Sequence, residues 1–440
     1  MPLEGYLALV AVLGLLGAAA LAYLAWRLDP AWLLTAALLL SVFNNHWDAF
    51  GLPSNAAPDR LFLIAGLAAV LLRAPAARDR PSLRPQPVHA LLALTLLWAV
   101  GSAIAAGTLT DRTALFGLLD RFAVPFALVL VAPLAFRTAR QRTILLSGLV
   151  AFGGYLGLTA LFETLGPRAL VFPQFILDPS HGLHGGRARG PFLEANANGV
   201  GLFAGGVAAL VAASTWRSWL WRAAAIAVAV LCAAGLLFTL TRSVWLASIV
   251  STLLVLTAAP RLRPLTVPAV AAGAVFVIAL LNFVPGLETR AQQRKDASRS
   301  VSERKNVNAA ALAMVSERPI VGFGWSTFRE RNAEYFPLLD DVPQTAELHL
   351  GIHNVPLLFA TELGLMGTLL YVLSFAGVIG SAALGRGPPT LDPWRAGLLA
   401  VAVFWVVVAL FAPVGQVFPL YITWLWAAVI LGASRRPAER

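Results

Sequence analysis

Charged residues are scarce in this chain: they make up 12% of its 440 residues, whereas 58% of the residues are hydrophobic. A soluble protein carries about 25% charged residues, so the composition excludes an ordinary soluble domain. Cysteine is nearly absent too, because Cys232 is the single one in the sequence. One thiol inside an apolar run cannot form a disulfide framework and is expected to pack as a small buried residue.

A regular alternation of polar and apolar residues is also lacking, and this argues against a membrane β-barrel. The apolar runs are continuous, and many approach the roughly 20 residues with which a helix crosses a bilayer. They predict an all-α polytopic membrane protein with twelve or thirteen transmembrane helices and one large, partly helical outer loop. The predicted spans are 5–26, 31–44, 60–72, 88–107, 114–135, 143–165, 198–214, 219–238, 243–258, 265–284, 353–384, 395–411 and 414–433.

Basic residues are missing before the first run, so we expect segment 1–25 to be a retained span and not a cleaved signal peptide. Arginines gather instead in short connections that all fall on one side if the spans alternate. This bias predicts that side to be cytoplasmic. The inner connections are then 73–84, 137–142, 217–222, 261–263, 386–395 and the tail, and the outer loops are 44–59, 107–113, 166–197, 239–242, 285–352 and 412–415.

The same pattern divides the chain into three parts: N-terminal spans over 1–284, a large outer loop over 285–352, and C-terminal spans over 353–440. The net charge of +11 then reflects topology and attraction to membrane lipids. Nucleic-acid binding is not expected, since the chain lacks a soluble basic domain.

Two outer segments carry arginines suited to an anion. Arg187 and Arg189 follow a Gly-Gly turn just before a helix expected to begin near Asn196, and a helix N-terminus with guanidinium groups is a typical phosphate site. Arg242 lies between two spans on the outer side, against the positive-inside bias, with Thr241 and Ser243 beside it. It is either an isolated snorkelling arginine or part of a polar pocket.

The large loop predicts a helix over 287–315, with Leu312 and Val315 on one face, followed by a tight turn at Gly322 and Gly324 and a short helix over 327–336. His353 stands where the next span begins. Histidine is the side chain most easily used as a base near neutral pH, so His353 becomes the candidate base beside the outer arginines. A helix cap is the structural alternative.

Other polar groups carry weaker signals. In the first outer loop, His46 and Asp48 flank Trp47, which reads as an interfacial aromatic residue with solvated neighbours more than as a catalytic acid. Asp120 and Arg121 lie inside the fifth span, either as a structural tether or as a substrate contact. The pairs His181/His184 and Asp340/Asp341 lack the spacing of a metal site, and we predict neither a metal nor another cofactor.

Five short motifs follow one another in order: Arg187-x-x-Gly190-x-Phe192-x-x-x-Asn196, Leu240-Thr241-Arg242-Ser243-x-Trp245, Ser302-Glu303-Arg304, Arg318-Pro319-Ile320-Val321-Gly322-Phe323-Gly324, and His353-Asn354 ahead of Glu362-Leu363-Gly364-x-x-Gly367. In these motifs the sequence resembles the O-antigen ligase and O-antigen polymerase superfamily of bacterial membrane glycosyltransferases. Ala195 stands where a proline is usual, and Arg189 is an additional arginine. Which of Arg187 and Arg189 contacts phosphate therefore stays open.

The resemblance implies an enzyme of the bacterial inner membrane that acts at its periplasmic face. Such an enzyme moves a glycan from undecaprenyl diphosphate to an acceptor hydroxyl without a metal. The acceptor is the lipid A-core for a ligase and another lipid-linked repeat for a polymerase; we expect the ligase. Carried over, the implied catalytic residues are His353, Arg187 and Arg242, and the implied substrate-binding residues are Arg189, Asn196, Arg304, Gly322, Gly324, Trp325 and Asn354.

We expect the large loop to close over the site as a lid, with the tight turn at Gly322 and Gly324 and with Arg304 as a further phosphate contact. Such a lid excludes water and so prevents hydrolysis of the donor. A transporter of lipid-linked sugars is the main rival from another class, and it predicts charges along a route through the membrane centre.

Overall fold

The computed structural model describes residues 17, 19–20, 22–44, 46–52, 57–73, 86–178, 180–181, 186–283, 299–336 and 351–434. Over these residues the chain forms helices and turns, without a β-strand. The helices are α2 (Pro30–Leu40), α3 (Pro58–Arg73), α4 (Pro87–Ala105), α5 (Arg112–Leu118), α6 (Val124–Ala135), α7 (Ala139–Leu165), α8 (Ala195–Thr215), α9 (Trp219–Phe238), α10 (Arg242–Ala258), α11 (Thr266–Phe283), α13 (Arg299–Glu317), α14 (Phe328–Arg331), α16 (Val355–Leu384), α17 (Asp392–Phe411) and α18 (Val417–Ser434).

The predicted fold class is confirmed. In the described part of the chain, nine helices are long and apolar enough to cross a membrane. The predicted spans 31–44 and 243–258 correspond to shorter apolar helices, and 60–72 corresponds to the 16-residue α3. The predicted first span, 5–26, lies mostly outside the described residues.

The centre of the bundle is formed by α8 and α18. In these two spans 83% and 89% of the residues are buried, whereas the share is 22% in α9 and 0% in the span that includes most of α11. Glycines let the central helices approach closely: a Cβ atom on Gly153 of α7 would lie 2.9 Å from the Cα atom of Gly205 of α8. In a membrane such close packing replaces the hydrophobic force that would hold helices together in water.

The loops that contact each other are ones that the sequence predicts to lie on the same side of the membrane. Among the inner connections, Arg261 pairs with Asp392 at 2.7 Å. Among the outer loops, the rings of His46 and Phe175 lie 5.4 Å apart, and the Thr108 hydroxyl donates to the Trp325 carbonyl at 2.8 Å. The loops thus meet as alternating spans require, while the orientation in the membrane stays a prediction.

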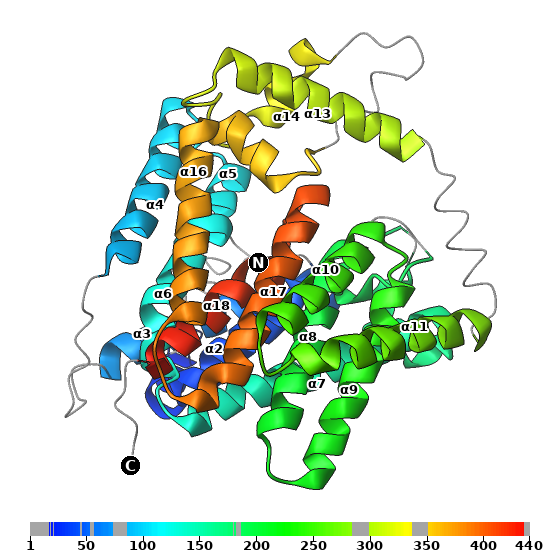
Figure 1. Cartoon of the computed structure of the whole chain (residues 1–440). Helices are drawn as coiled ribbons and strands as arrows, with labels where there is room; N and C mark the ends of the chain where they lie inside the picture. Colours follow the sequence, from blue (N-terminus) through cyan, green and yellow to red (C-terminus); the bar gives the residue numbers. More distant parts are fainter. Residues whose placement is uncertain are drawn as a thin grey trace, which may run out of the picture.

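The described part of the large loop covers the outer end of α16. Figure 1 shows α13 and α14 lying across the first part of α16, with α4 alongside it. The buried face of α13 consists of Val307, Ala311 and Met314, which pack with Phe323 and other aromatic and aliphatic residues. The sequence-based choice of Leu312 for the packed face is wrong, since Leu312 is 57% exposed.

The turn after α13 is locked into a break in α16. The break lies at Gly364, whose φ of 71° is left-handed. Backbone hydrogen bonds cross it in both directions: Leu365 N–H donates to the Pro319 carbonyl at 2.7 Å, and Gly324 N–H donates to the Glu362 carbonyl at 2.9 Å. The fourth and fifth sequence motifs are therefore two halves of one backbone junction.

Replacing Gly322 by alanine should destabilise the protein far more than the same change at Gly51. Both glycines have a positive φ, of 70° and 74°, and a side chain there costs roughly 1–3 kcal/mol. A Cβ atom on Gly322 would also lie 2.5 Å from the Gly364 nitrogen, whereas Gly51 has open space around it. Thermal unfolding in detergent measures the difference, and equal shifts for the two variants would refute a tight junction.

Candidate functional site

Arg187 lies in a loop that three helices hold in place. Ala188 N–H donates to the carbonyl of Phe238 at the end of α9, at 3.0 Å. The Asn198 side chain on α8 donates to the Ala188 carbonyl, also at 3.0 Å. The Glu163 carboxylate on α7 accepts the next two backbone N–H groups at 3.1 and 3.2 Å. The loop is therefore fastened next to the connection between α9 and α10.

Asn196 and Arg242 are brought together by the starts of two helices. Arg242 is the first residue of α10, and Asn196 lies in the first turn of α8. The Ser243 hydroxyl donates to Asn196 Oδ1 at 3.0 Å, so the two N-termini touch. Backbone N–H groups and the positive ends of the helix dipoles favour an anion at such a place.

Arg304 extends this positive cluster from the large loop. It lies in the second turn of α13, and its side chain is partly covered by its neighbours while part of it stays accessible to solvent. Partial burial lowers the pKa of Arg304, and the nearby positive charge of Arg242 lowers it further. Two guanidinium groups that repel each other gain from an anion between them. The structure therefore brings the second and third motifs close together.

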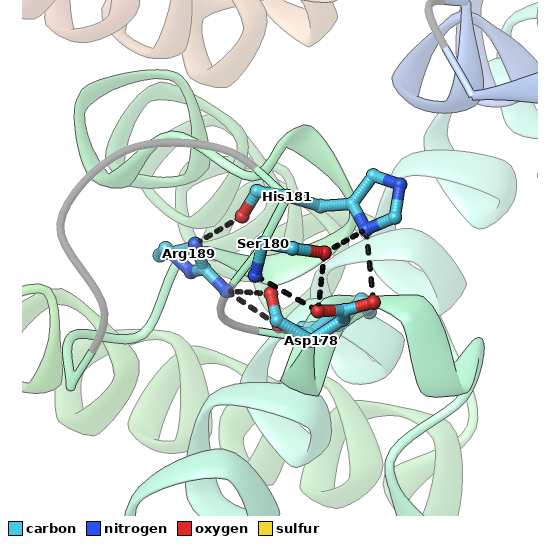
Figure 2. Close-up of polar contacts among 5 residues, drawn as sticks. Asp178, Ser180, His181 and Arg189 are labelled. Atoms are coloured by element: carbon cyan, nitrogen blue, oxygen red, sulfur yellow. Dashed lines mark hydrogen bonds and ion pairs between the residues drawn. The ribbon is translucent and has the colours of Figure 1, made fainter.

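Arg189 is held by the turn that includes Asp178 and His181, as Figure 2 shows. Its side chain is 3% exposed, and its guanidinium donates to the carbonyls of His181 at 2.6 Å, Ile176 at 2.9 Å and Asp178 at 3.2 Å. These bonds hold the turn that precedes the Arg187 loop. This geometry argues against the predicted substrate contact at Arg189 and favours Arg187, which is half-buried, as the phosphate ligand.

The Arg189→Ala variant should therefore lose stability, whereas Arg187→Ala should lose activity. Removing a buried guanidinium leaves the carbonyls that it satisfies without this donor, and each unsatisfied buried group costs roughly 1–3 kcal/mol. Thermal unfolding of the two variants in the same detergent provides the comparison. A normal melting temperature for Arg189→Ala together with lost donor binding would reverse this assignment.

His353 stands at the start of α16, as predicted, and its neighbour Asn354 caps that helix. Asn354 Oδ1 accepts the N–H of a residue in the first turn at 2.8 Å, so this side chain has a structural role at the start of the helix. On the other side of His353, Ile352 belongs to the same buried cluster as Val307 of α13. Val307 lies one turn beyond Arg304, so the histidine and the arginine come from elements packed against each other.

The turn after α13 is held against the membrane helices by three residues, which are Gly322, Gly324 and Trp325. Trp325 is 3% exposed, and its indole N–H donates to the carbonyl of Ala114 at 2.9 Å. This burial argues against the predicted substrate contact of Trp325. Gly322 and Gly324 have φ values of 70° and 112°, which confirms the turn. A side chain on Gly324 would collide with Ala106, so the turn is fixed against α4.

Two acidic residues that matter here were missed by the sequence reasoning. Glu163 holds the loop of Arg187, and Glu194 occupies the N-cap position of α8. Burial raises the pKa of Glu194 to about 7, although a hydrogen bond with Asn196 opposes the shift. The available signal for Glu194 was an acid directly before an apolar run. Such a carboxyl can take up a proton near neutral pH and so tolerate an anion beside it.

Residues suited to hold a metal do not gather in the described ranges, where no group of three or more His, Cys, Asp or Glu side chains is placed around one point. Asp340, Asp341, His184 and His349 lie outside these ranges. The clustered polar groups of the site are guanidinium, imidazole and amide groups. This set of donors binds phosphate oxygens well.

Residues 227–372 match the family model described as O-antigen ligase. The matched stretch contains Arg242, Arg304 and His353, and it ends beyond the junction at Gly364. No curated protein matches the chain. The match confirms the resemblance to the O-antigen ligase and polymerase superfamily, whose members are membrane glycosyltransferases acting on lipid-linked glycans. It applies equally to ligases and polymerases.

Proposed function

We propose that this protein is an O-antigen ligase of the bacterial inner membrane, which transfers a glycan from undecaprenyl diphosphate to the lipid A-core at the periplasmic face. The observation that carries this proposal is the meeting of Arg242 and Arg304 at the touching N-termini of α8 and α10. The loop of Arg187 is bonded through Ala188 to Phe238, four residues before Arg242. A positive cluster of this kind, at the end of membrane spans, suits a diphosphate that is anchored in the membrane by a lipid tail.

The same cluster supports the chemistry of the transfer. The acceptor oxygen attacks the anomeric carbon of the donor sugar, and the bond from this carbon to the phosphate oxygen breaks. Negative charge grows on the leaving undecaprenyl diphosphate, where Arg187, Arg242 and Arg304 stabilise it. His353 takes the proton of the acceptor hydroxyl. The products are the extended acceptor and free undecaprenyl diphosphate.

The placement of the charges favours a transferase over a transporter. Arg187 precedes α8, Arg242 begins α10, and His353 precedes α16. All three stand at helix ends, whereas a transporter needs polar groups along a path through the membrane centre.

A transfer assay separates the proposed ligase from a polymerase. Purified protein in lipid nanodiscs is incubated with lipid-linked glycan, once with lipid A-core and once without it. Modified lipid A-core supports the ligase, and lengthened lipid-linked glycan in the absence of an acceptor identifies a polymerase. Movement of the glycan lipid across a vesicle membrane without new glycosidic bonds would refute the transferase.

Transfer should continue in excess EDTA. The reason is that fixed guanidinium groups can neutralise a leaving diphosphate, a task for which other transferases use a divalent ion. The initial rate is measured before and after chelation, with a magnesium-dependent transferase as the positive control for the chelator. Loss of the rate, with recovery on adding magnesium or manganese, would contradict this prediction and point to Asp48, Asp340 and Asp341.

A further inference from the structure

A polar pocket opens among the predicted outer loops, and Arg187, Arg242 and Arg304 are not part of its lining. Its volume of about 320 Å³ lies at the lower end of the roughly 300–1,000 Å³ typical of ligand pockets. It is formed by the loop after α2, the first turn of α3, α5 and the turn that joins α5 to α6. The lining includes Asn44, Asp48, Arg60, Arg112, Phe116 and Asp120.

The floor of the pocket is a rigid ion pair. Arg60 binds both carboxylate oxygens of Asp120, at 2.9 and 3.2 Å, and the Tyr421 hydroxyl donates to the same carboxylate at 2.8 Å. The tether predicted for Asp120 is thus present. Arg60 also lies over the ring of Phe116, with 4.8 Å between the guanidinium carbon and the ring centre. This contact holds the wall in place.

The charges of the lining cancel. Asp120 is neutralised by Arg60, and at the exposed rim Asp48 faces the solvent together with Arg112. A phosphate would need an excess of guanidinium charge, and a cation would need several uncommitted carboxylates. What the pocket offers instead is a mixture of hydrogen-bond donors and acceptors without net charge. This pattern suits a neutral molecule with many hydroxyl groups.

The pocket and the arginine cluster share a support. His46, next to the pocket residue Trp47, packs on Phe175. Phe175 belongs to the turn whose carbonyls accept hydrogen bonds from Arg189. Arg189 follows Arg187 by two residues. We propose that the Asp48–Arg112 pocket binds one neutral sugar ring of the donor glycan or of the acceptor. This inference rests on the proposed function and adds a sugar subsite to it.

Direct binding tests the pocket without requiring transfer. Methyl glycosides of glucose, galactose, mannose and N-acetylglucosamine are added to the intact protein in nanodiscs, and binding is followed by saturation-transfer NMR. Wild type should bind at least one of them, and Asp48→Ala and Arg112→Ala should each weaken that binding about tenfold, the effect of one lost charged hydrogen bond. Arg261→Ala, an exposed arginine at the opposite end of the bundle, should leave binding unchanged.

The outcomes separate this inference from the proposed function. Arg242→Ala should lose transfer but keep glycoside binding, and inorganic pyrophosphate should not displace the glycoside. In the transfer assay, a higher KM for the donor or for the acceptor in Asp48→Ala assigns the sugar ring to that substrate. Absence of glycoside binding, displacement by pyrophosphate, or unchanged KM values for both substrates would overturn the subsite while leaving the arginine site intact.

Discussion

Replacing His353 by alanine should nearly abolish glycan transfer while donor binding persists. A general base contributes about 10²–10⁴-fold to a rate. His353 lies at the start of α16, which packs against α13, the helix that carries Arg304. The imidazole can therefore reach an acceptor hydroxyl near the leaving diphosphate. The initial transfer rate is the decisive measurement, together with binding of lipid-linked donor to the variant.

Two further variants make this test specific. His353→Gln keeps a polar side chain of similar reach but cannot accept the proton at neutral pH, so it should be as inactive as His353→Ala. His89→Ala removes a histidine in the first turn of α4, at the predicted inner side, and should leave the chemical step intact. Wild-type turnover in His353→Gln across the neutral pH range would make His353 structural, and the base would then be sought at Asp48 or His349.

Arg242→Ala should reduce transfer about ten- to hundredfold, because a charge-assisted hydrogen bond to phosphate contributes roughly 1.5–3 kcal/mol. The loss should appear in donor affinity and also in kcat, since charge on the diphosphate grows in the transition state. Arg242→Lys should recover the activity partly, because lysine keeps the charge but cannot bind two oxygens at once. Kinetics with varied donor concentration measure both effects.

The neighbouring arginine provides an internal check on this prediction. If Arg242 and Arg304 bind the same diphosphate, the double variant should lose less than the product of the two single losses, because the sites are coupled. Arg261→Ala serves as the matched control for removing an exposed arginine. Full activity of Arg242→Ala at normal protein levels would remove Arg242 from the site.

Structural features that depend only on consecutive residues could be predicted from the sequence. The membrane spans follow from continuous apolar runs, which are a local property, and nine of the thirteen predicted runs are full-length membrane helices among the described residues. Errors arise where polar groups set the boundary. The span predicted over 143–165 begins at Ala139 because Thr138 caps the helix by accepting the N–H of Gln141 at 3.2 Å.

The sequence by itself therefore determined the membrane class, the order of the motifs and the candidate residues Arg187, Arg242 and His353. The tertiary structure decided which of the arginines are buried in the protein and which of them lie close together. Arg189 is buried because carbonyls from an earlier turn converge on it, and Arg304 meets Arg242 because α13 packs across the end of α16. Hydropathy is summed along the chain, whereas the burial of a side chain depends on distant segments that fold against it.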